Sequence, residues 1–432
     1  MYNVMDPSSP QFVVVRNQQQ RLSLWPASKE VPVGWTAISD PCSKEECERV
    51  LRTGGETGPQ QNEAESGAGA GAEKQAQRPM VRNMDVGLMF FGDNEYSSER
   101  NRYDFLLECA RYADQHGLSA IWLPERHFTT FGCLFPSPAV LHAALARETE
   151  RIRLRAGSVV MPLNDPIRVA EEWAVVDNLS NGRVDVSFAS GWHPNDFVLA
   201  PDKYESRYDC MYEGIQQVQR YWRGETCSAV NGKGESVDVR IYPTPIQASL
   251  PIWLTAASSP QTFLRAGELG FNVITHLFDQ QVDQLAKKIA IYRQARVDSG
   301  RSARGGTVTV TLHAFMGETL DDVREHARTP YRNYLKSNLS LLKNLAISRG
   351  MDVEIDRLGE EQTDQMIDFM FEKFLGGRSL LGTPESCLEM ARQLSEIGVD
   401  ELACLVDFGP STERILGSLP HLAELQRALR SS

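Results

Sequence analysis

The sequence predicts an α/β protein in which residues 83–432 form a (β/α)8 (TIM) barrel with insertions. From residue 83 onward, eight apolar stretches of strand length alternate with segments whose apolar residues recur at helical spacing. Two long interruptions, at 203–250 and 318–400, are typical of the extended loops that barrels carry at their catalytic end. An open, doubly wound sheet is the alternative, because strand counting alone does not separate the two architectures.

The individual elements follow from apolar periodicity and from the residues that end helices. We expect strands at 85–91, 120–123, 152–161, 184–189, 252–255, 272–275, 308–315 and 402–407. We expect helices at 98–115, 139–149, 166–179, 260–269, 280–299 and 412–428. Gly117 follows the first helix, where a glycine commonly ends one, and Pro260 stands where a proline commonly opens one.

A small α+β module is predicted at residues 1–52, before a linker at 53–82. Residues 53–79 are rich in Gly, Ala, Glu and Gln and contain no aromatic or branched apolar residue, so they cannot bury enough surface to become ordered. The module itself carries strand patterns at 12–15, 20–25 and 34–38. A start resembling a capping box at 43–46 predicts a short helix that runs to residue 51.

Composition and charge exclude several classes of protein. The net charge is −12 and the pI about 5.3, which argues against a general nucleic-acid binder because such proteins need a basic face. Residues 1–10 are polar and no run of about 18 apolar residues occurs, so we expect neither a secretory signal nor a membrane span. The eight cysteines include no Cys-x-x-Cys pair. We therefore expect reduced thiols, no zinc site and a cytoplasmic protein.

Candidate catalytic groups follow the predicted strands, because a barrel enzyme gathers its active site at the carboxyl ends of its strands. The trio Glu125-Arg126-His127 follows the second strand, His193 follows the fourth and His276 follows the sixth. The candidates are Arg126, His127, His193 and His276. Each also has a structural interpretation: a buried ion pair for the trio, packing at the strand end for His193, and a hydrogen-bonded core histidine for His276.

A second group of residues is suited to an anion. Ser258 and Ser259 precede the helix at 260–269, and Thr262 lies in its first turn. The free amides of a helix start, together with these hydroxyls, would form an anion pocket. A plain serine N-cap accounts for the same pattern.

Glycines mark two further positions. Gly157 and Ser158 interrupt the third apolar strand, which indicates either close approach of a ligand to the backbone or a β-bulge. Ser190 and Gly191 follow the fourth strand, where the glycine permits a tight turn.

Several catalytic signatures are absent from the sequence. It contains no His or carboxylate cluster with metal spacing, no Gly-x-Ser-x-Gly elbow and no Gly-x-x-x-x-Gly-Lys loop. Gly-x-Gly-x-x-Gly is also absent. We therefore expect no metal and no nicotinamide-binding Rossmann domain.

Several stretches of the chain closely resemble the flavin-dependent luciferase-like monooxygenases. They are LPERHFTTFG, RLRAGSVVMPLNDPIRVAEEW, DNLSNGRVDVSFASGWHPNDF, LTAASSPQTFLRAGELGFNVITHL and GTPESCLEMARQLSEIGVDELACLVDFG. The resemblance extends over nearly all of residues 84–430, and the nearest subgroup serves polyketide and non-ribosomal peptide pathways. It implies the barrel of the bacterial luciferase type, reduced FMN from a separate flavin reductase, O2 as a second substrate, and a homodimer.

The resemblance also implies how the flavin is held. Ser258, Ser259 and Thr262 would bind its phosphate. Gly157-Ser158 falls where the family has a non-proline cis peptide behind the isoalloxazine ring.

Two positions depart from the family pattern. Ser190 and Gly191 stand where the family often supplies a phosphate-binding arginine, so other groups must neutralise the phosphate here. At the His-His pair of the luciferases this chain has Arg126-His127, with Arg126 in the place of the catalytic histidine. Bioluminescence chemistry is therefore not carried over.

The N-terminal module resembles the MbtH-like proteins, small partners that bind and activate adenylation domains of peptide synthetases. The stretch QQRLSLWPASKEVPVGW, with Cys47 downstream, carries this resemblance. It implies that an adenylation domain is contacted by Ser23, Leu24, Trp25, Pro26 and Trp35. The family's Trp-Thr-Asp-x-Arg-Pro tail is missing, because residue 52 leads directly into the linker. Core packing of a tiny sheet is the alternative role for the two tryptophans.

Together these features predict a monooxygenase that uses reduced FMN and O2. We expect it to oxygenate a small acyl or aminoacyl group on a carrier domain of a peptide synthetase. Two rival functions remain open: a deazaflavin-dependent oxidoreductase on the same barrel, and a catalytically silent scaffold beside an adenylation domain. The sequence identifies neither the substrate nor the oxidised atom.

Overall fold

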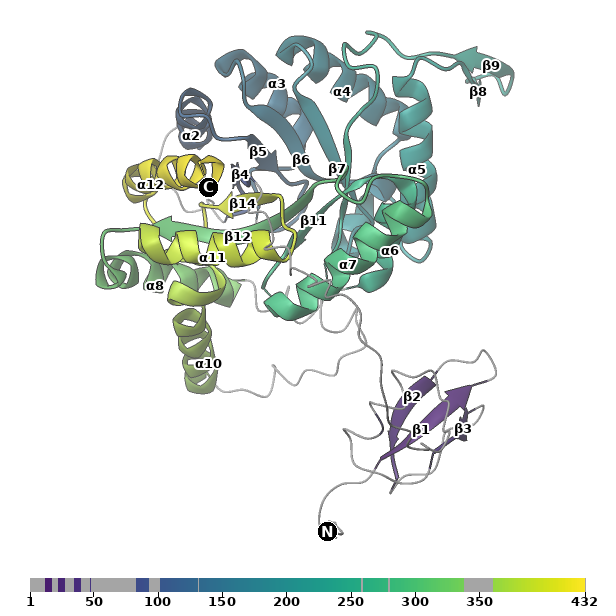
Figure 1. The fold of residues 1–432 in the computed structure, drawn as a ribbon. Helices are drawn as coiled ribbons and strands as arrows, with labels where there is room; N and C mark the ends of the chain where they lie inside the picture. The colour runs from purple at the N-terminus through teal and green to yellow at the C-terminus, as the bar shows by residue number, and fades with distance from the viewer. Residues whose placement is uncertain are drawn as a thin grey trace, which may run out of the picture. The chain divides into compact units, whose positions relative to one another are not determined.

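The computed structural model describes residues 12–17, 22–27, 35–39, 47, 83–92, 102–130, 132–257, 259–278, 280–337 and 360–431. The chain separates into two compact units, Met1–Ala76 and Gln77–Ser432. The first unit holds a small sheet and the second holds a barrel (Figure 1).

The N-terminal unit contains an antiparallel sheet in the order β2-β1-β3. Its strands are β1 (Phe12–Asn17), β2 (Leu22–Pro26) and β3 (Trp35–Ala37), which agree with the three expected strands. Trp25 pairs with Val13, and Trp35 pairs with Asn17. The expected helix that ends at residue 51 lies outside the described residues, apart from Cys47, which is helical. Cys47 is disulfide-bonded, so the expectation that all thiols are reduced was wrong.

Eight parallel strands of the second unit close into a barrel, as the sequence predicts. Around the ring they are β4 (Asp85–Met89), β5 (Ala120–Leu123), β6 (Arg153–Val160), β7 (Val184–Ala189), β10 (Ile252–Thr255), β11 (Asn272–His276), β12 (Val308–Met316) and β14 (Glu401–Leu405). Pairing of β11 with β12 and of β14 with β4 closes the ring. The open, doubly wound sheet is therefore excluded.

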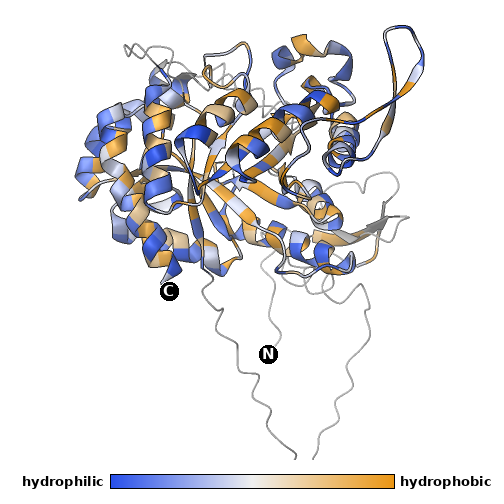
Figure 2. Ribbon diagram, turned by 90° about the horizontal axis from the view of Figure 1, so that it is seen from above, coloured by the Kyte–Doolittle hydropathy of each residue, from blue (hydrophilic) through white to orange (hydrophobic). Residues whose placement is uncertain are grey.

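Helices surround this ring. They are α2 (Asp104–Gln115), α3 (Pro138–Glu148), α4 (Pro166–Ser180), α5 (Arg207–Trp222), α6 (Pro260–Leu269), α7 (Val282–Asp298), α11 (Pro384–Glu396) and α12 (Thr412–Arg430). Hydrophobic residues concentrate on the strands and hydrophilic residues on the outer faces of the helices (Figure 2). Within the described ranges, no helix combines the length and hydrophobicity that a bilayer span requires.

Local sequence sets where these helices begin and end. Asp165 caps α4 by accepting hydrogen bonds from the amides of Ile167 and Arg168, and Pro166 takes the first position. The left-handed Asn181 then ends α4, and the left-handed Gly270 ends α6. These sharp boundaries position each following strand.

The interruption at 203–250 was expected to form an extended loop at the catalytic end, and the structure places it differently. Its first part is α5, a helix of the barrel itself, which returns the chain to the amino-terminal end of the strands. A hairpin of β8 (Cys227–Val230) and β9 (Ser236–Val239) follows and projects away from the barrel (Figure 1). The side chain of Gln247 then donates to Asp177 and to the backbone oxygen of Val184, at the start of β7. Residues 227–247 therefore lie away from the catalytic end.

The interruption at 318–400 begins at the carboxyl end of β12. Its described residues form α8 (Leu320–Ser337), α10 (Glu360–Lys373), a π-helical turn η5 (Phe374–Arg378) and β13 (Leu380–Gly382), followed by α11 of the outer ring of helices. β13 extends the sheet beside the last residues of β12, an addition that the sequence analysis missed. Tyr331 of α8 and Phe371 of α10 are fully buried against each other, with ring centroids 5.7 Å apart.

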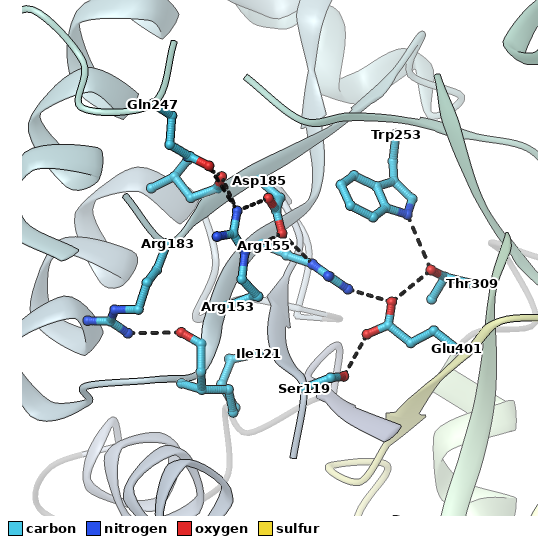
Figure 3. Close-up of polar contacts among 12 residues, drawn as sticks. Ser119, Ile121, Arg153, Arg155, Arg183, Asp185, Gln247, Trp253, Thr309 and Glu401 are labelled. Atoms are coloured by element: carbon cyan, nitrogen blue, oxygen red, sulfur yellow. Dashed lines mark hydrogen bonds and ion pairs between the residues drawn. The ribbon is translucent and has the colours of Figure 1, made fainter. Parts of the chain in front are cut away.

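Charged side chains fill the amino-terminal half of the barrel interior (Figure 3). Nε of Arg155 donates to Asp185 across 2.6 Å, and its Nη1 forms an ion pair with Glu401. The hydroxyl of Thr309 donates to Glu401, and the indole of Trp253 donates to Thr309. We call Arg155, Asp185 and Glu401 the floor triad.

Attraction between the opposite charges of the floor triad opposes the effect of their burial. Burial alone would lower the pKa of Arg155, yet Glu401 and Asp185 hold it above its ordinary value. The guanidinium also lies 5.0 Å from the ring centroid of Trp122 and 4.7 Å from that of Trp253. Removing one member of such a group leaves an uncompensated buried charge, which costs far more than the net value of the ion pair.

We expect Arg155→Met to lower the free energy of unfolding by about 3–5 kcal/mol, because Glu401 would be left buried without its cation and Asp185 would retain its ion pair with Arg153 alone. Arg168→Met is the matched control, because that arginine is 67% exposed and pairs with Glu172 on the surface. Its effect should stay within about 1 kcal/mol. Urea denaturation measures both, and similar losses in the two variants would contradict the role of the floor triad.

Candidate functional site

The site lies at the carboxyl ends of the strands, where β5 and β7 bring three of the four predicted catalytic residues together. Arg126 follows β5, and its Nη1 donates to Oδ2 of Asp196 across 3.1 Å. His193 follows β7, and its Nδ1 lies 3.9 Å from Oδ1 of the same aspartate. His127 follows Arg126 directly. Asp196 was missed by the sequence analysis, although it belongs to the quoted stretch after β7.

Arg126 is fixed by packing on several sides. Its Cζ lies 5.9 Å from the ring centroid of Phe91 and 5.2 Å from that of Trp192. A Cβ at Gly132, whose φ is +72°, would come within 2.7 Å of the arginine side chain, so glycine is required there. Burial lowers the pKa of Arg126 and raises that of Asp196, and attraction between the two groups opposes both shifts. The result is a buried positive charge at the end of β5.

Glu125 anchors His127 to the neighbouring strand. Oε1 of the carboxylate lies 3.0 Å from Nε2 of His127, and Oε2 accepts the amide of Val160 across 2.7 Å. Nδ2 of Asn164 donates to both carboxylate oxygens. The buried ion pair considered for the trio is thus formed by Arg126 with Asp196, while Glu125 orients the histidine.

Gly157 and Ser158 form an irregularity in β6. Ala156 pairs with Val186 and the next pair is Val159 with Phe188, so the strand carries a bulge. The Gly157–Ser158 peptide is cis, as the family resemblance implies. A Cβ on Gly157 would lie 3.1 Å from the ring of Trp122.

The hydroxyl of Ser158 joins a small polar cluster on the inner wall. It contacts the hydroxyls of Ser187 and Thr255, from β7 and β10. The hydroxyl oxygens of Ser187 and Thr255 lie 2.9 Å apart. Both residues were also missed by the sequence analysis, because their strands were identified only by their apolar residues.

At the start of α6, the backbone oxygen of Ser259 accepts the amide of Thr262 across 3.3 Å. Ser259 occupies the N-cap position, but its side chain makes no capping hydrogen bond. The plain serine N-cap is therefore not what the structure contains. Thr262 lies in the first turn and is partly exposed. Ser258 lies outside the described residues.

Ser190 and Gly191 lie at the end of β7, both partly buried. Gly191 has a φ of +78°, and a Cβ there would come within 2.8 Å of the ring of Phe197. Burial lowers the pKa of the neighbouring His193, and Asp196 acts in the opposite direction. His193 also accepts the amide of Asn195 and thereby caps the turn at Pro194–Leu199.

His276 lies on another part of the wall, at the end of β11. The amide of Phe278 donates to its Nδ1 across 3.3 Å. In the closed ring, β11 stands four strand positions from β5, so His276 and Arg126 occupy opposite sides of the barrel. The structure therefore does not group His276 with the other three candidates.

His313 of β12 is a site residue that the sequence analysis missed. Thr309, Thr311 and His313 alternate with apolar residues, and Thr309 faces the floor triad inside the barrel. His313 thus points inward near the carboxyl end of the strand. Burial, with His276 nearby, lowers its pKa to about 3. The alternation of polar residues in 308–315 was the signal that could have identified it.

Asp407 is a further buried acid, just beyond β14. Its two carboxylate oxygens accept the amides of Phe91 and Gly92, each across 2.8 Å. Burial nevertheless raises its pKa to about 6. Asp407 therefore holds the chain that leaves β4 against the end of β14.

Comparison with known families assigns both parts of the chain. Residues 84–401 match the family model of the luciferase-like monooxygenases, and residues 1–53 match that of the MbtH-like proteins. Over 337 residues the chain is 26% identical to the oxygenase component of the flavin-dependent trigonelline monooxygenase of Acinetobacter baylyi. That match covers 76% of this chain and 90% of the relative.

Solved structures share the fold. The oxygenating constituent of 3,6-diketocamphane monooxygenase from Pseudomonas putida, in complex with FMN, superimposes with a TM-score of 0.62 at 18% identity. An F420-dependent secondary alcohol dehydrogenase superimposes with a TM-score of 0.57 at 14% identity. Each comparison covers 79% of this chain, with 98% of the first structure and 99% of the second.

The low pKa of His313 has a measurable consequence for stability. His313 stays neutral in the folded chain down to about pH 3, whereas in the unfolded chain it binds a proton below about pH 6.5. The stability that neutral His313 contributes is therefore complete above about pH 6.5 and is lost as pH falls from about 6.5 toward 3. Because of this group, the free energy of unfolding should fall by about 2 kcal/mol between pH 7.5 and pH 5.0.

We expect His313→Phe to remove that part of the pH dependence. Urea denaturation at pH 7.5 and 5.0 provides the measurement. Tyr331→Phe is the control, because it alters the same packing without removing a group that titrates in this range. An unchanged acid sensitivity in His313→Phe would show that His313 is not buried in its neutral form.

Proposed function

Because the chain belongs to the luciferase-like monooxygenase family, we propose that its barrel uses reduced FMN and O2 to add oxygen to a small organic substrate. The main support for this proposal is the start of α6, because Ser259 occupies the N-cap position but its hydroxyl makes no capping hydrogen bond. The amides and hydroxyls of a helix start suit a phosphate. The flavin-dependent relative and the FMN complex support the same cofactor.

The residues around the mouth fit FMN in this proposal. Ser258, Ser259 and Thr262 would hold its phosphate, and Ser190 and Gly191 would border it from the end of β7. The cis peptide at Gly157–Ser158 would lie behind the ring. When bound, reduced FMN supplies the electrons that activate O2.

The chain's own side chains would then orient the reacting groups. Arg126, held by Asp196, would offer a fixed positive charge to a developing negative charge. His127, anchored through Nε2 by Glu125, would exchange a proton through Nδ1. His193, which lies beside Asp196, would alter the net charge around Arg126. His276 would contact the substrate from the opposite wall. Helix α8 would exclude water, as this chemistry requires.

We expect Ser259→Ala and Thr262→Val to weaken FMN binding about tenfold each, because each loses a hydrogen bond to a charged phosphate. Quenching of FMN fluorescence on titration measures this effect. Ser259→Ala should leave stability unchanged, since the hydroxyl makes no capping bond.

Ser411→Ala is the matched control for that experiment. Ser411 caps α12 by accepting the amide of Arg414, so its loss should cost about 1 kcal/mol of stability and leave FMN binding intact. If Ser259→Ala lost stability but kept its affinity for FMN, the phosphate site would be refuted.

We propose further that the substrate is an acyl or aminoacyl group on a carrier domain of a peptide synthetase, within non-ribosomal peptide or polyketide biosynthesis. The MbtH-like domain supports this proposal, because such a module suits docking to an adenylation domain through Ser23, Leu24, Trp25, Pro26 and Trp35. A flavin reductase would supply the reduced cofactor, and a homodimer is the proposed assembly. The segment 53–82 would tether the barrel beside the synthetase, raising the local concentration to the order of mM.

We expect deletion of residues 1–52 to slow oxygenation of the carrier-bound substrate and to leave the rate on the same free substrate unchanged. Mass spectrometry after incubation with FMN and a reductase would detect the gain of one oxygen atom. The full-length variant Trp25→Ala/Trp35→Ala is the control that keeps the linker length. Equal rates for the intact and truncated chains would refute tethering.

A deazaflavin-dependent oxidoreductase is the second candidate function, because an F420-dependent dehydrogenase shares the fold. Parallel titrations with FMN and with F420 separate the two. Preferential binding of F420, with no oxygen uptake in the presence of a flavin reductase, would favour this second function.

A further inference from the structure

A set of aromatic rings encloses His313 at the carboxyl end of the barrel. The imidazole centroid lies 5.1 Å from the rings of both Tyr331 and Tyr334 on α8, and 5.5 Å from that of Phe408. Phe278 and Phe374 complete the set at 6.3 and 6.4 Å. We call these six residues the His313 enclosure. It joins the barrel wall to the segment that covers it.

Two polar atoms in this enclosure have no hydrogen-bond partner among the described residues. They are Nε2 of His313 and the hydroxyl of Tyr331, and both are buried. His313 is 8% exposed and Tyr331 is fully buried. Leaving such atoms unsatisfied is unfavourable, so retained orphan groups call for a ligand or a bound water.

The enclosure is continuous with the mouth of the barrel. Tyr334 packs both against the enclosure and against an interior cluster that includes Met89, Trp122 and Leu405. Trp122 in turn contacts Gly157, the residue proposed to lie behind the flavin ring. Packed side chains therefore connect the enclosure to the strand proposed to lie behind the flavin ring.

The chemistry of the enclosure favours a neutral guest. Burial keeps His313 uncharged at neutral pH, so one ring nitrogen accepts a hydrogen bond. Arg378 lies over the ring of Phe374, but its Nη2 already donates to the backbone oxygens of Leu277 and Gln280. A hydroxyl group has both functions that these atoms require, since it can donate to a ring nitrogen and accept from a phenol. Surrounding aromatic rings favour a flat ring as its carrier.

We propose that the His313 enclosure binds the ring of a phenolic substrate, whose hydroxyl bridges Nε2 of His313 and the hydroxyl of Tyr331. This inference rests on the proposed function and narrows its acyl or aminoacyl substrate to one that bears a phenol. Opening of α8 away from β12 admits the ring, and closure excludes water from it.

The test compares two probes that differ only in the hydroxyl, N-acetyltyrosinamide and N-acetylphenylalaninamide, on the full-length chain. Isothermal titration calorimetry should show that the tyrosine compound binds at least about tenfold more tightly. Tyr331→Phe and His313→Phe should each abolish this preference. Tyr331→Phe should fold normally, because its hydroxyl has no protein partner to lose.

Tyr292→Phe is the matched control. The hydroxyl of Tyr292 is buried like that of Tyr331, but it donates to the backbone oxygen of Phe271 across 2.8 Å. Its removal should therefore lower stability and leave the preference for the tyrosine compound intact. Equal affinity for the two probes, or a preference that survives Tyr331→Phe, overturns the inference.

FMN titration of the same samples separates this inference from the proposed function. Normal FMN binding without a hydroxyl preference refutes the enclosure and leaves the flavin site standing. A hydroxyl preference without FMN binding refutes the flavin proposal and supports the enclosure. A crystal structure soaked with N-acetyltyrosinamide that contains only water between His313 and Tyr331 also refutes the enclosure.

Discussion

Neutralisation of one buried guanidinium is the constraint on which the barrel depends. Arg155 of β6 meets Asp185 of the neighbouring strand and Glu401, which lies 246 residues further along the chain. Both carboxylates oppose the effect of burial on the pKa of this group, and both meet it at one point inside the ring. Closure of the barrel by β14 is therefore tied to the register of β6 and β7. The same side chains fill the interior below the mouth.

The floor triad lies in the amino-terminal part of the barrel interior, and the candidate site lies at the carboxyl ends of the strands. Two walls of different character remain there. One combines Arg126, Asp196 and His193 with Glu125 and His127, so it carries charge and fixed hydrogen bonds. The opposite wall is aromatic and keeps His313 neutral. Such a division suits a charged reaction on one side and a flat, uncharged substrate on the other.

The local patterns of the sequence were sufficient for the barrel strands and for most helices, because each buries an apolar face with its own period. They misjudged residues 203–250, since α5 belongs to the barrel and the segment after it lies at the opposite end. They also missed Asp196 and His313. A single aspartate in a loop carries no periodic signal. The alternation of polar residues in β12 indicates that His313 points inward, but it does not indicate its partners, which are distant in the chain.

The sequence by itself determined the alternation of strands and helices, the glycines at positive φ and the hydroxyl-rich start of α6, since each depends on neighbours within a few residues. Only the tertiary structure decided that Ser259 leaves α6 uncapped, that Arg126 pairs with Asp196, and that His276 faces them from the far wall. These outcomes depend on how eight strands share one ring. The order of pairing and the direction of each side chain are properties of the closed barrel, which no single segment encodes.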